Sequence, residues 1–152
     1  MTHEPDEART RTHRTIDRLQ QALLAGDMNA FADEWAPHGT ATFPFAPPGW
    51  PSPKGRDEVR TYLSGLSGSV EIRGIRHQTR HDTADPGTVV LEWGVTGIVR
   101  ATGKPYDIDY VVVITVGDEG IESFRDYWNP LAIAGATGGV EALASVFSGN
   151  GQ

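Results

Sequence analysis

The sequence predicts a single α+β domain, because helical patterns come first and strand-like patterns follow. Apolar residues recur at helical spacing in three stretches before residue 70, whereas residues 70–129 alternate and are divided by short turns rich in Gly, Asp and Pro. The 152 residues fit one domain, since a chain of this length buries roughly two-thirds of its unfolded surface in one core. Helices followed by antiparallel strands are typical of the α+β class.

Three helices are expected in the first part of the chain. Ile16, Leu19 and Leu23 share one helical face, and a short second helix is capped by Asp27 and extends toward Trp35. The third helix is marked by apolar residues at helical spacing, at Val59, Leu63 and Leu66, with Tyr62 beside them.

Strand patterns begin at residues 40–45, where Ala41, Phe43 and Phe45 alternate with small or polar residues. The proline-rich stretch 46–54 is expected to form a semi-rigid flap. Four further strands are expected over residues 70–80, 88–101, 105–116 and 121–129. The domain organisation is therefore a flexible N-terminus (1–11), the folded domain (12–134) and a glycine-rich tail (135–152) with a short helix at Val140–Phe147.

Composition excludes several classes of protein and site. The chain has no cysteine, so neither disulfides nor thiolate metal sites can form. Its net charge of −7 repels phosphate backbones and argues against nucleic-acid binding. No apolar run approaches the ~20 residues of a membrane span, and residues 1–14 have no apolar segment typical of a secretory signal. We expect a cytoplasmic protein with no membrane partner.

The order of elements, with LLAGDMNAF between two helices, KGRDEVRTYL opening the third and IESFRDYWNPL as the last strand, resembles the nuclear transport factor two-like superfamily. Within it the chain is most similar to the SnoaL-like polyketide cyclases and the phenazine-biosynthesis proteins, and more distantly to ketosteroid isomerase. The resemblance implies a cone-shaped barrel, in which a strongly bent mixed or antiparallel sheet wraps three N-terminal helices around one pocket, commonly in a homodimer.

The ketosteroid isomerase pattern is mostly absent from this chain. The resemblance places that family's general base near Phe43 and its oxyanion-hole tyrosine near Leu19, where neither residue type is present. The segment Ile108–Tyr110 resembles the region that holds its oxyanion-hole aspartic acid, which would correspond to Asp109. Steroid isomerisation itself is therefore not expected.

The simplest register of the last hairpin pairs Val116 with Ile121 and Val111 with Asp126. Regular alternation then places Asp109 and Asp126 diagonally on one face, about 7–8 Å apart at the backbone. The resemblance assigns that face to the cavity. Burial there would raise the pKa of at least one carboxyl group.

These two residues are the catalytic candidates. Asp126 would be the general base, by resemblance to the last strand of the SnoaL-like cyclases, and a protonated Asp109 would donate a hydrogen bond to a developing enolate oxygen. A structural role is the alternative for each, with Asp126 pairing with a nearby arginine or capping a loop.

Seven further residues are candidates for substrate binding, each with a structural alternative. Aromatic rings could form the wall of the pocket or simply pack in the core; an amide or imidazole could contact a ligand or lie at the surface. They are Trp128, Trp93, Tyr62, Phe43, Phe124, Asn129 and His77.

His77 and His81 lack a third converging ligand, so no metal is expected. The opposite sheet face would suit a homodimer interface, formed by Glu92, Thr96, Arg100, Tyr110, Val112 and Ile114.

The functional hypothesis is a cofactor-independent acid/base enzyme of natural-product metabolism, a cyclase or isomerase acting next to the carbonyl group of an aromatic or polyketide-like small molecule. One alternative is a non-catalytic small-molecule-binding protein. Another is an epoxide hydrolase or dehydratase that uses the same carboxylates. No nucleotide-binding glycine motif or serine-hydrolase motif is present.

Overall fold

The computed structural model describes residues 3–137, which form four helices and five strands. In chain order these are α1 (His3–Ala25), α2 (Met28–Ala32), β1 (Trp35–Thr42), α3 (Arg56–Ser69), β2 (Val70–Asp82), β3 (Thr88–Val99), β4 (Pro105–Gly117), β5 (Gly120–Trp128) and α4 (Pro130–Thr137). The predicted α+β class is confirmed, as is the order of the first three helices and five strands along the chain.

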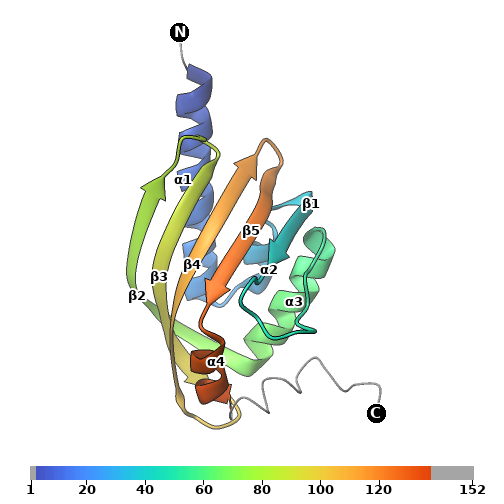
Figure 1. Cartoon of the computed structure of the whole chain (residues 1–152), viewed down its shortest axis with the longest axis vertical. Helices are drawn as coiled ribbons and strands as arrows, with labels where there is room; N and C mark the ends of the chain where they lie inside the picture. The colour runs from blue at the N-terminus through green and yellow to red at the C-terminus, as the bar shows by residue number, and fades with distance from the viewer. Residues whose placement is uncertain (1–2, 138–152) are drawn as a thin grey trace.

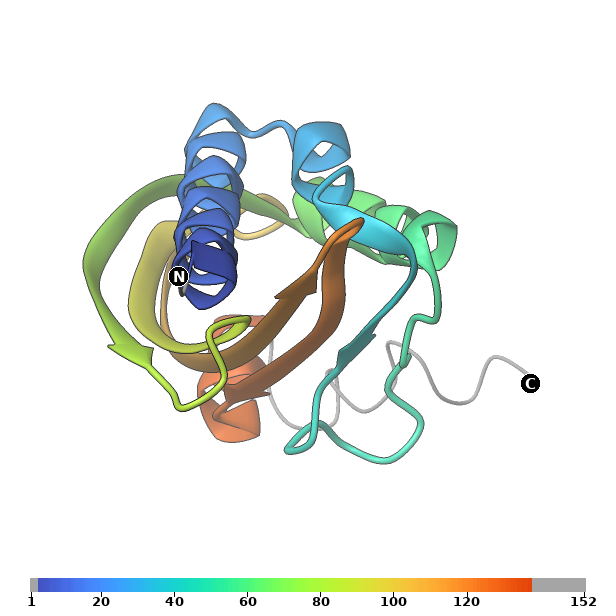
Figure 2. The ribbon, with the colours of Figure 1, turned by 90° about the horizontal axis from the view of Figure 1, so that it is seen from above.

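The strands form one mixed sheet in the order β1-β5-β4-β3-β2. Strand β1 runs parallel to β5, and every other neighbouring pair is antiparallel. The sheet curls so that its concave side faces α1, α2 and α3, while α4 closes its lower end (Figures 1 and 2). This open, curved sheet with helices in its hollow is consistent with the cone-shaped architecture that the family resemblance implies.

Helix α1 begins at His3, so residues 3–11, predicted as a flexible N-terminus, are helical. Its apolar stripe is buried against the sheet, with Ile16 and Leu19 almost inaccessible. Above this stripe Thr12 donates to the carbonyl oxygen of Pro86 at 3.0 Å, which ties the helix to the β2–β3 turn. The helix predicted at Val140–Phe147 lies outside the described residues.

The second helix is shorter than expected, because Trp35 belongs to the first strand. The Asp27 side chain caps α2 as predicted, accepting from the backbone N–H of Ala30 at 3.0 Å. The helix ends at Ala32. Trp35 is 1% exposed at the centre of the core, where its ring packs 5.0 Å from that of Phe124.

A bulge in β5 decides which residues of the last hairpin face the hollow. Val116 pairs with Ile121 as expected, but Thr115 pairs with Ser123, so Glu122 has no partner on β4. An extra residue on one strand shifts the pairing by one beyond the bulge and reverses the face of every following partner. Val112, rather than Val111, therefore pairs with Asp126.

Within the described residues no helix is both long and apolar enough to cross a membrane.

Candidate functional site

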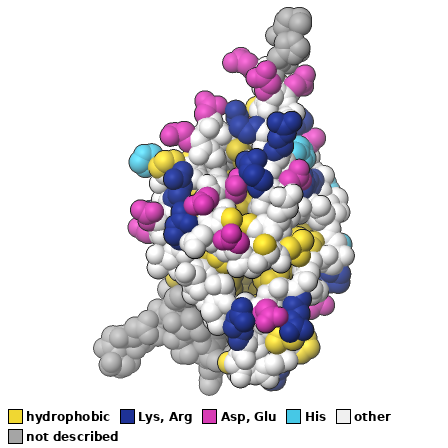
Figure 3. All heavy atoms as spheres, turned by 180° about the vertical axis from the view of Figure 1, so that it is seen from behind, with side chains coloured by type: hydrophobic (Ala, Val, Ile, Leu, Met, Phe, Trp, Pro, Cys, Tyr) yellow, Lys and Arg dark blue, Asp and Glu magenta, His cyan; other side chains and the backbone are white. Residues whose placement is uncertain are grey.

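A cavity of about 760 Å³ opens between the concave face of the sheet, α2, α3 and the proline-rich flap at residues 46–54. Its volume is in the range of small-molecule sites. Hydrophobic side chains gather across the middle of the face seen from behind, below the charged upper part of the molecule (Figure 3). The wall is largely apolar. Apart from exposed polar residues of α3 and the flap, the side chains that bring polar atoms to the wall are Trp50, Tyr62, Trp93, Tyr106, Tyr110 and Asp126.

The Asp126 carboxyl group points into this cavity from β5. Its Oδ1 atom is buried and has no hydrogen-bond partner within residues 3–137. Burial raises the pKa of Asp126 well above its usual range, because an apolar environment disfavours the charged form. The group can therefore hold a proton at a pH where ordinary aspartates are ionised, and it is a strong base once it loses that proton.

Asp109 lies on the outer face of the sheet, which corrects the prediction that it shares the cavity with Asp126. Its side chain is 70% exposed, and its Oδ1 atom accepts from Arg76 at 2.7 Å and lies 3.0 Å from His77 Nε2. The hydrogen bond with His77, followed by that from Arg76, holds the pKa of Asp109 below its usual range. A protonated Asp109 facing a substrate, the basis of the predicted acid pair, does not fit this position.

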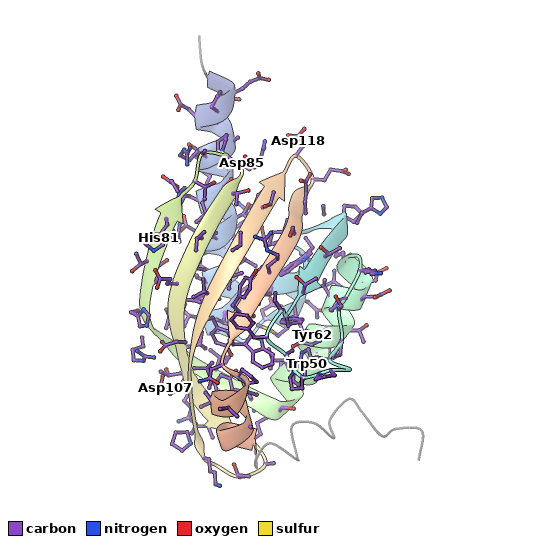
Figure 4. The ribbon with its side chains drawn as sticks, in the orientation of Figure 1. Trp50, Tyr62, His81, Asp85, Asp107 and Asp118 are labelled. Carbon is purple, nitrogen blue, oxygen red and sulfur yellow. The ribbon has the colours of Figure 1, made fainter. Side chains whose placement is uncertain are left out.

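Four aromatic side chains, three of them sequence candidates, form one wall at the flap. Trp50 Nε1 donates to the Tyr62 hydroxyl at 3.1 Å, joining the flap to α3, and both residues lie together beside β5 in Figure 4. Phe43 stacks on Tyr62 at 4.9 Å, and Trp128 lies 5.2 Å from Trp50 in an edge contact. Ring contacts and one hydrogen bond therefore hold the flap against α3 and β5 at the rim of the cavity.

Trp93 and Phe124 also line the cavity, in two different settings. Trp93 is 4% exposed, and its Nε1–H has no hydrogen-bond partner within the described chain. Phe124 packs against Phe31 and Trp35, so its ring belongs to the hydrophobic core as well as to the cavity wall.

Two predicted contact residues lie away from the cavity. Asn129 is exposed, and its Oδ1 atom accepts from the backbone N–H of Leu131 at 2.9 Å at the start of α4. This is the structural alternative considered from the sequence. His77 lies with Asp109 on the outer face, because β2 and β4 present these residues on the convex side.

Sequence reasoning missed two tyrosines, Tyr106 and Tyr110, whose hydroxyl groups contact each other in the cavity. Burial raises the pKa of both, to about 12 for Tyr106 and further for Tyr110. The negative charge of Asp126 also raises these pKa values, so the three groups share one environment. The sequence of β4 contained a signal for the inward position of the tyrosines. Every second residue from Tyr106 to Val116 is apolar or aromatic, whereas the residues between them include two aspartates, as expected for an outer face.

The predicted dimer face is corrected in the same way. Tyr110, Val112 and Ile114 face the interior, and the last two are fully buried. Glu92 and Arg100 are exposed. The proposed interface therefore mixed residues from both sides of the sheet.

Among residues 3–137, no three His, Cys, Asp or Glu side chains come close enough to hold a metal ion. The chemistry that the described cavity itself can supply is proton transfer by Asp126 and hydrogen-bond donation by tyrosine and tryptophan side chains.

Two curated relatives align with most of the chain. YesE of Bacillus subtilis, an uncharacterized protein, is 32% identical over 126 residues, which cover 82% of this chain and 86% of that protein. The uncharacterized PhzA/B-like protein PA3332 of Pseudomonas aeruginosa is 34% identical over 128 residues, covering 84% and 90%.

Solved structures share the fold. A "putative isomerase" from Bacillus subtilis superposes with a TM-score of 0.79 at 31% identity, covering 89% of this chain and 96% of that one. A phenazine biosynthesis-related protein from Pseudomonas aeruginosa has a TM-score of 0.74 at 15% identity, covering 90% of each chain. A "putative polyketide cyclase" from Xanthomonas campestris has a TM-score of 0.68 at 19% identity, covering 80% and 93%.

A family model for the SnoaL-like domain matches residues 16–124, from the core of α1 to the wall residue Phe124. With the relatives at more than 30% identity, this match assigns the family. The chain belongs to the SnoaL-like domain family.

Proposed function

We propose that this protein is a cofactor-independent acid/base enzyme, a cyclase or isomerase that moves a proton next to a carbonyl group of an aromatic or polyketide-like small molecule. The single observation that carries the proposal is the Asp126 carboxyl group, which lines a large apolar cavity and whose Oδ1 atom is buried without a partner among the described residues. A structural aspartate is normally hydrogen-bonded or paired when it is buried.

The proposed step needs one carboxylate and one oxygen site. Asp126 removes a proton from the carbon next to the substrate carbonyl, the C–H electron pair forms a C=C bond, and the carbonyl π electrons move onto oxygen. In an isomerisation the substrate has a neighbouring C=C bond, and the protonated Asp126 returns the proton to the far carbon of the conjugated dienolate. In a cyclisation the enolate carbon attacks a second carbonyl carbon to close a ring, and Asp126 gives its proton to the alkoxide oxygen that forms there. The raised pKa of Asp126 suits this role, since a stronger base takes a carbon-bound proton more readily.

Names of similar proteins support this class of reaction. The Bacillus subtilis neighbour carries an isomerase name and the Xanthomonas campestris neighbour a polyketide cyclase name. Isomerisation and cyclisation both begin with proton removal next to a carbonyl, which is the step that Asp126 could perform.

A non-catalytic small-molecule-binding protein is the second candidate. The observation that favours it is the lack of a second buried carboxyl or imidazole group near Asp126 among the described lining residues, where Asp57 and Glu58 are exposed. The same apolar cavity would serve binding alone.

Exchange of carbon-bound protons separates these candidates. The protein is incubated with 2-tetralone in D₂O, and loss of the signals of protons next to the carbonyl is followed by NMR. Wild type is expected to accelerate exchange, and Asp126→Asn to slow it by about 10²–10⁴-fold, the usual contribution of a general base. Asp109→Asn is the matched control, because it removes a carboxylate from the outer face and should exchange at the wild-type rate.

Two results would overturn the enzyme proposal. One is an Asp126→Asn protein that exchanges as fast as wild type. The other is a wild-type protein that binds the ketone saturably and leaves its exchange rate unchanged, which would establish the binding function instead.

A further inference from the structure

We propose that the Tyr106–Tyr110 hydroxyl pair, with the N–H group of Trp93, forms a binding site for the carbonyl oxygen of an uncharged ligand, and that Tyr106 donates the hydrogen bond to that oxygen. This inference deepens the proposed function and rests on it for the reaction that the oxygen site would assist. It gives a specific role to Trp93, a binding candidate from the sequence, and adds the two tyrosines that the sequence analysis did not include among the site residues.

Counting protons in the tyrosine pair shows that one hydroxyl group must still donate. The pair has two O–H protons, and their mutual hydrogen bond uses one. Within residues 3–137 neither hydroxyl makes another hydrogen bond. The remaining O–H therefore needs an acceptor, and both side chains line the cavity.

Tyr106 is the better donor of the two. Either hydroxyl group can donate within the pair. Burial raises the pKa of Tyr106 to about 12 and that of Tyr110 further, so Tyr106 carries the more acidic hydroxyl group and is assigned the outward hydrogen bond, with Tyr110 donating within the pair. An O–H group that already accepts a hydrogen bond is polarised and becomes a stronger donor.

Trp93 supplies an independent second donor in the same row of the sheet. It lies directly opposite Tyr110 in the β3–β4 ladder, on the cavity side. Trp93 is only 4% exposed, and its Nε1–H has no hydrogen-bond partner within the described chain. Leaving a buried N–H group without an acceptor costs about 1–3 kcal/mol, so an acceptor from a ligand would be favourable there.

The charges around the cavity restrict the ligand further. Among the described lining residues there is no Lys, Arg or His, and the charged groups are Asp126 with Asp57 and Glu58 at α3. A carboxylate or phosphate would meet no counter-ion and would be repelled. A cationic amine has no lone pair for the donors at Tyr106 and Trp93. An uncharged ligand with a carbonyl oxygen on a flat apolar body needs no counter-ion and accepts hydrogen bonds from these donors.

The site also fits the reaction. When Asp126 removes the neighbouring proton, the carbonyl oxygen becomes an enolate oxygen and the hydrogen bond from Tyr106 strengthens. The two groups act at different atoms, Asp126 at carbon and Tyr106 at oxygen. Both lie on the concave face of the β4–β5 pair, where Asp126 raises the pKa of Tyr106 by its charge.

Three probes of one ring size test the inference: 2-acetylnaphthalene, 2-isopropenylnaphthalene, which has CH₂ in place of the carbonyl oxygen, and 2-naphthoate. Wild type is expected to bind the ketone about tenfold more tightly than the alkene, as one hydrogen bond to an otherwise unsatisfied donor allows. It should bind the carboxylate more weakly than either. The carbonyl stretch of the bound ketone should shift to lower frequency than in an apolar solvent.

Tyr106→Phe should reduce the preference for the ketone and the shift of its carbonyl stretch, while affinity for the alkene stays the same. Tyr127→Phe is the matched control, because Tyr127 lies on the outer face of β5, in an edge contact with Phe45, and should behave as wild type. Unchanged binding of the alkene shows that each variant has kept its cavity.

Asp126→Asn should retain the preference for the ketone, so a failure of proton exchange and a failure of the oxygen site are read separately. The inference is overturned if wild type binds ketone and alkene equally with an unshifted carbonyl stretch, a result that needs no variant. It is also overturned if Tyr106→Phe keeps both the preference and the shift, or if 2-naphthoate binds as tightly as the ketone.

Discussion

Val112 lies directly opposite Asp126 in the antiparallel ladder of β4 and β5. Val112 is fully buried, so this pairing places the Asp126 carboxyl group on the concave face. Side chains alternate between the two faces along β4, so Val111 and Asp109 both point outward. The Oδ1 atom of Asp126 is buried, whereas the Asp109 side chain is largely exposed, and the pKa values of the two groups move in opposite directions.

The stability of the protein should fall as pH rises through the titration of Asp126. Its folded pKa is raised above the ordinary value of 3.8, so the folded state binds the proton more tightly than the unfolded chain. As pH rises above that ordinary value the unfolded chain releases its proton first, and the free energy of unfolding falls by about 1.4 kcal/mol per unit of difference in pKa.

Asp126→Asn lacks this titration. Chemical denaturation from pH 4 to 8 should show the variant gaining stability relative to wild type with rising pH. Parallel curves for the two proteins would mean that the carboxyl group is not buried as described.

The contribution of Asp109 to stability should depend on pH with the opposite sign. Its folded pKa is lowered from 3.8 by His77 and Arg76, so its stabilising contribution is present above that value and is lost as pH falls through the folded pKa. The effect of Asp109→Asn should be small, because the side chain is largely exposed and its ion pairs are screened. Thermal unfolding at pH 7 and pH 3 measures it; a large loss of stability, or a change in ligand affinity, would contradict a position on the outer face.

The hydrogen bond from Trp50 to Tyr62 should stabilise the closed flap. Trp50→Phe and Tyr62→Phe each remove it and keep an aromatic ring. A double-mutant cycle on the free energy of unfolding should give a coupling of about 0.5–1.5 kcal/mol. Ligand dissociation, followed by tryptophan fluorescence, should be several-fold faster in Tyr62→Phe. Additive effects of the two substitutions would show that the bond does not form in solution.

Deletion of Glu122 should be tolerated, because this residue has no partner on β4. Without it Ile121, Phe124 and Asp126 follow regular alternation and still face inward. Insertion of one alanine after Ser123 instead reverses Phe124, Asp126 and Trp128 and should abolish folding. Circular dichroism and cavity binding compare the two variants; an unfolded deletion variant would show that the bulge itself is required.

Much of the fold could be predicted because local patterns agree with the final structure. The stripe of Ile16, Leu19 and Leu23 is buried as expected, and Asp27 caps the next helix. The turn at Gly117–Gly120 closes the last hairpin, where Gly120 adopts a φ of 122° that suits glycine. Residues 3–11 were expected to be flexible because they are highly charged, but they are helical and continue into Thr12, which is hydrogen-bonded to the β2–β3 turn.

The candidate site was predicted less well, because the one unpaired residue, Glu122, changes which side chains of β4 face the cavity. Regular alternation was assumed through Glu122, and Asp109 was therefore placed inside and Tyr110 outside. A bulge has no reliable local signal in a single sequence. The spacing of three between buried Ile121 and Phe124 does not fit regular alternation and was the available warning. Asp126 was found because its own strand pattern, with Phe124 and Trp128, remained valid beyond the bulge.

Direct titration of Asp126 tests the central claim, that an isolated carboxyl group in the apolar cavity retains its proton. The protein is labelled with ¹³C at aspartate side-chain carboxyl carbons, and the signals of Asp126 and Asp109 are assigned by comparison with the two asparagine variants. Asp126 is expected to titrate well above 3.8 and Asp109 below it. An Asp126 signal that titrates at or below the ordinary aspartate value would contradict it.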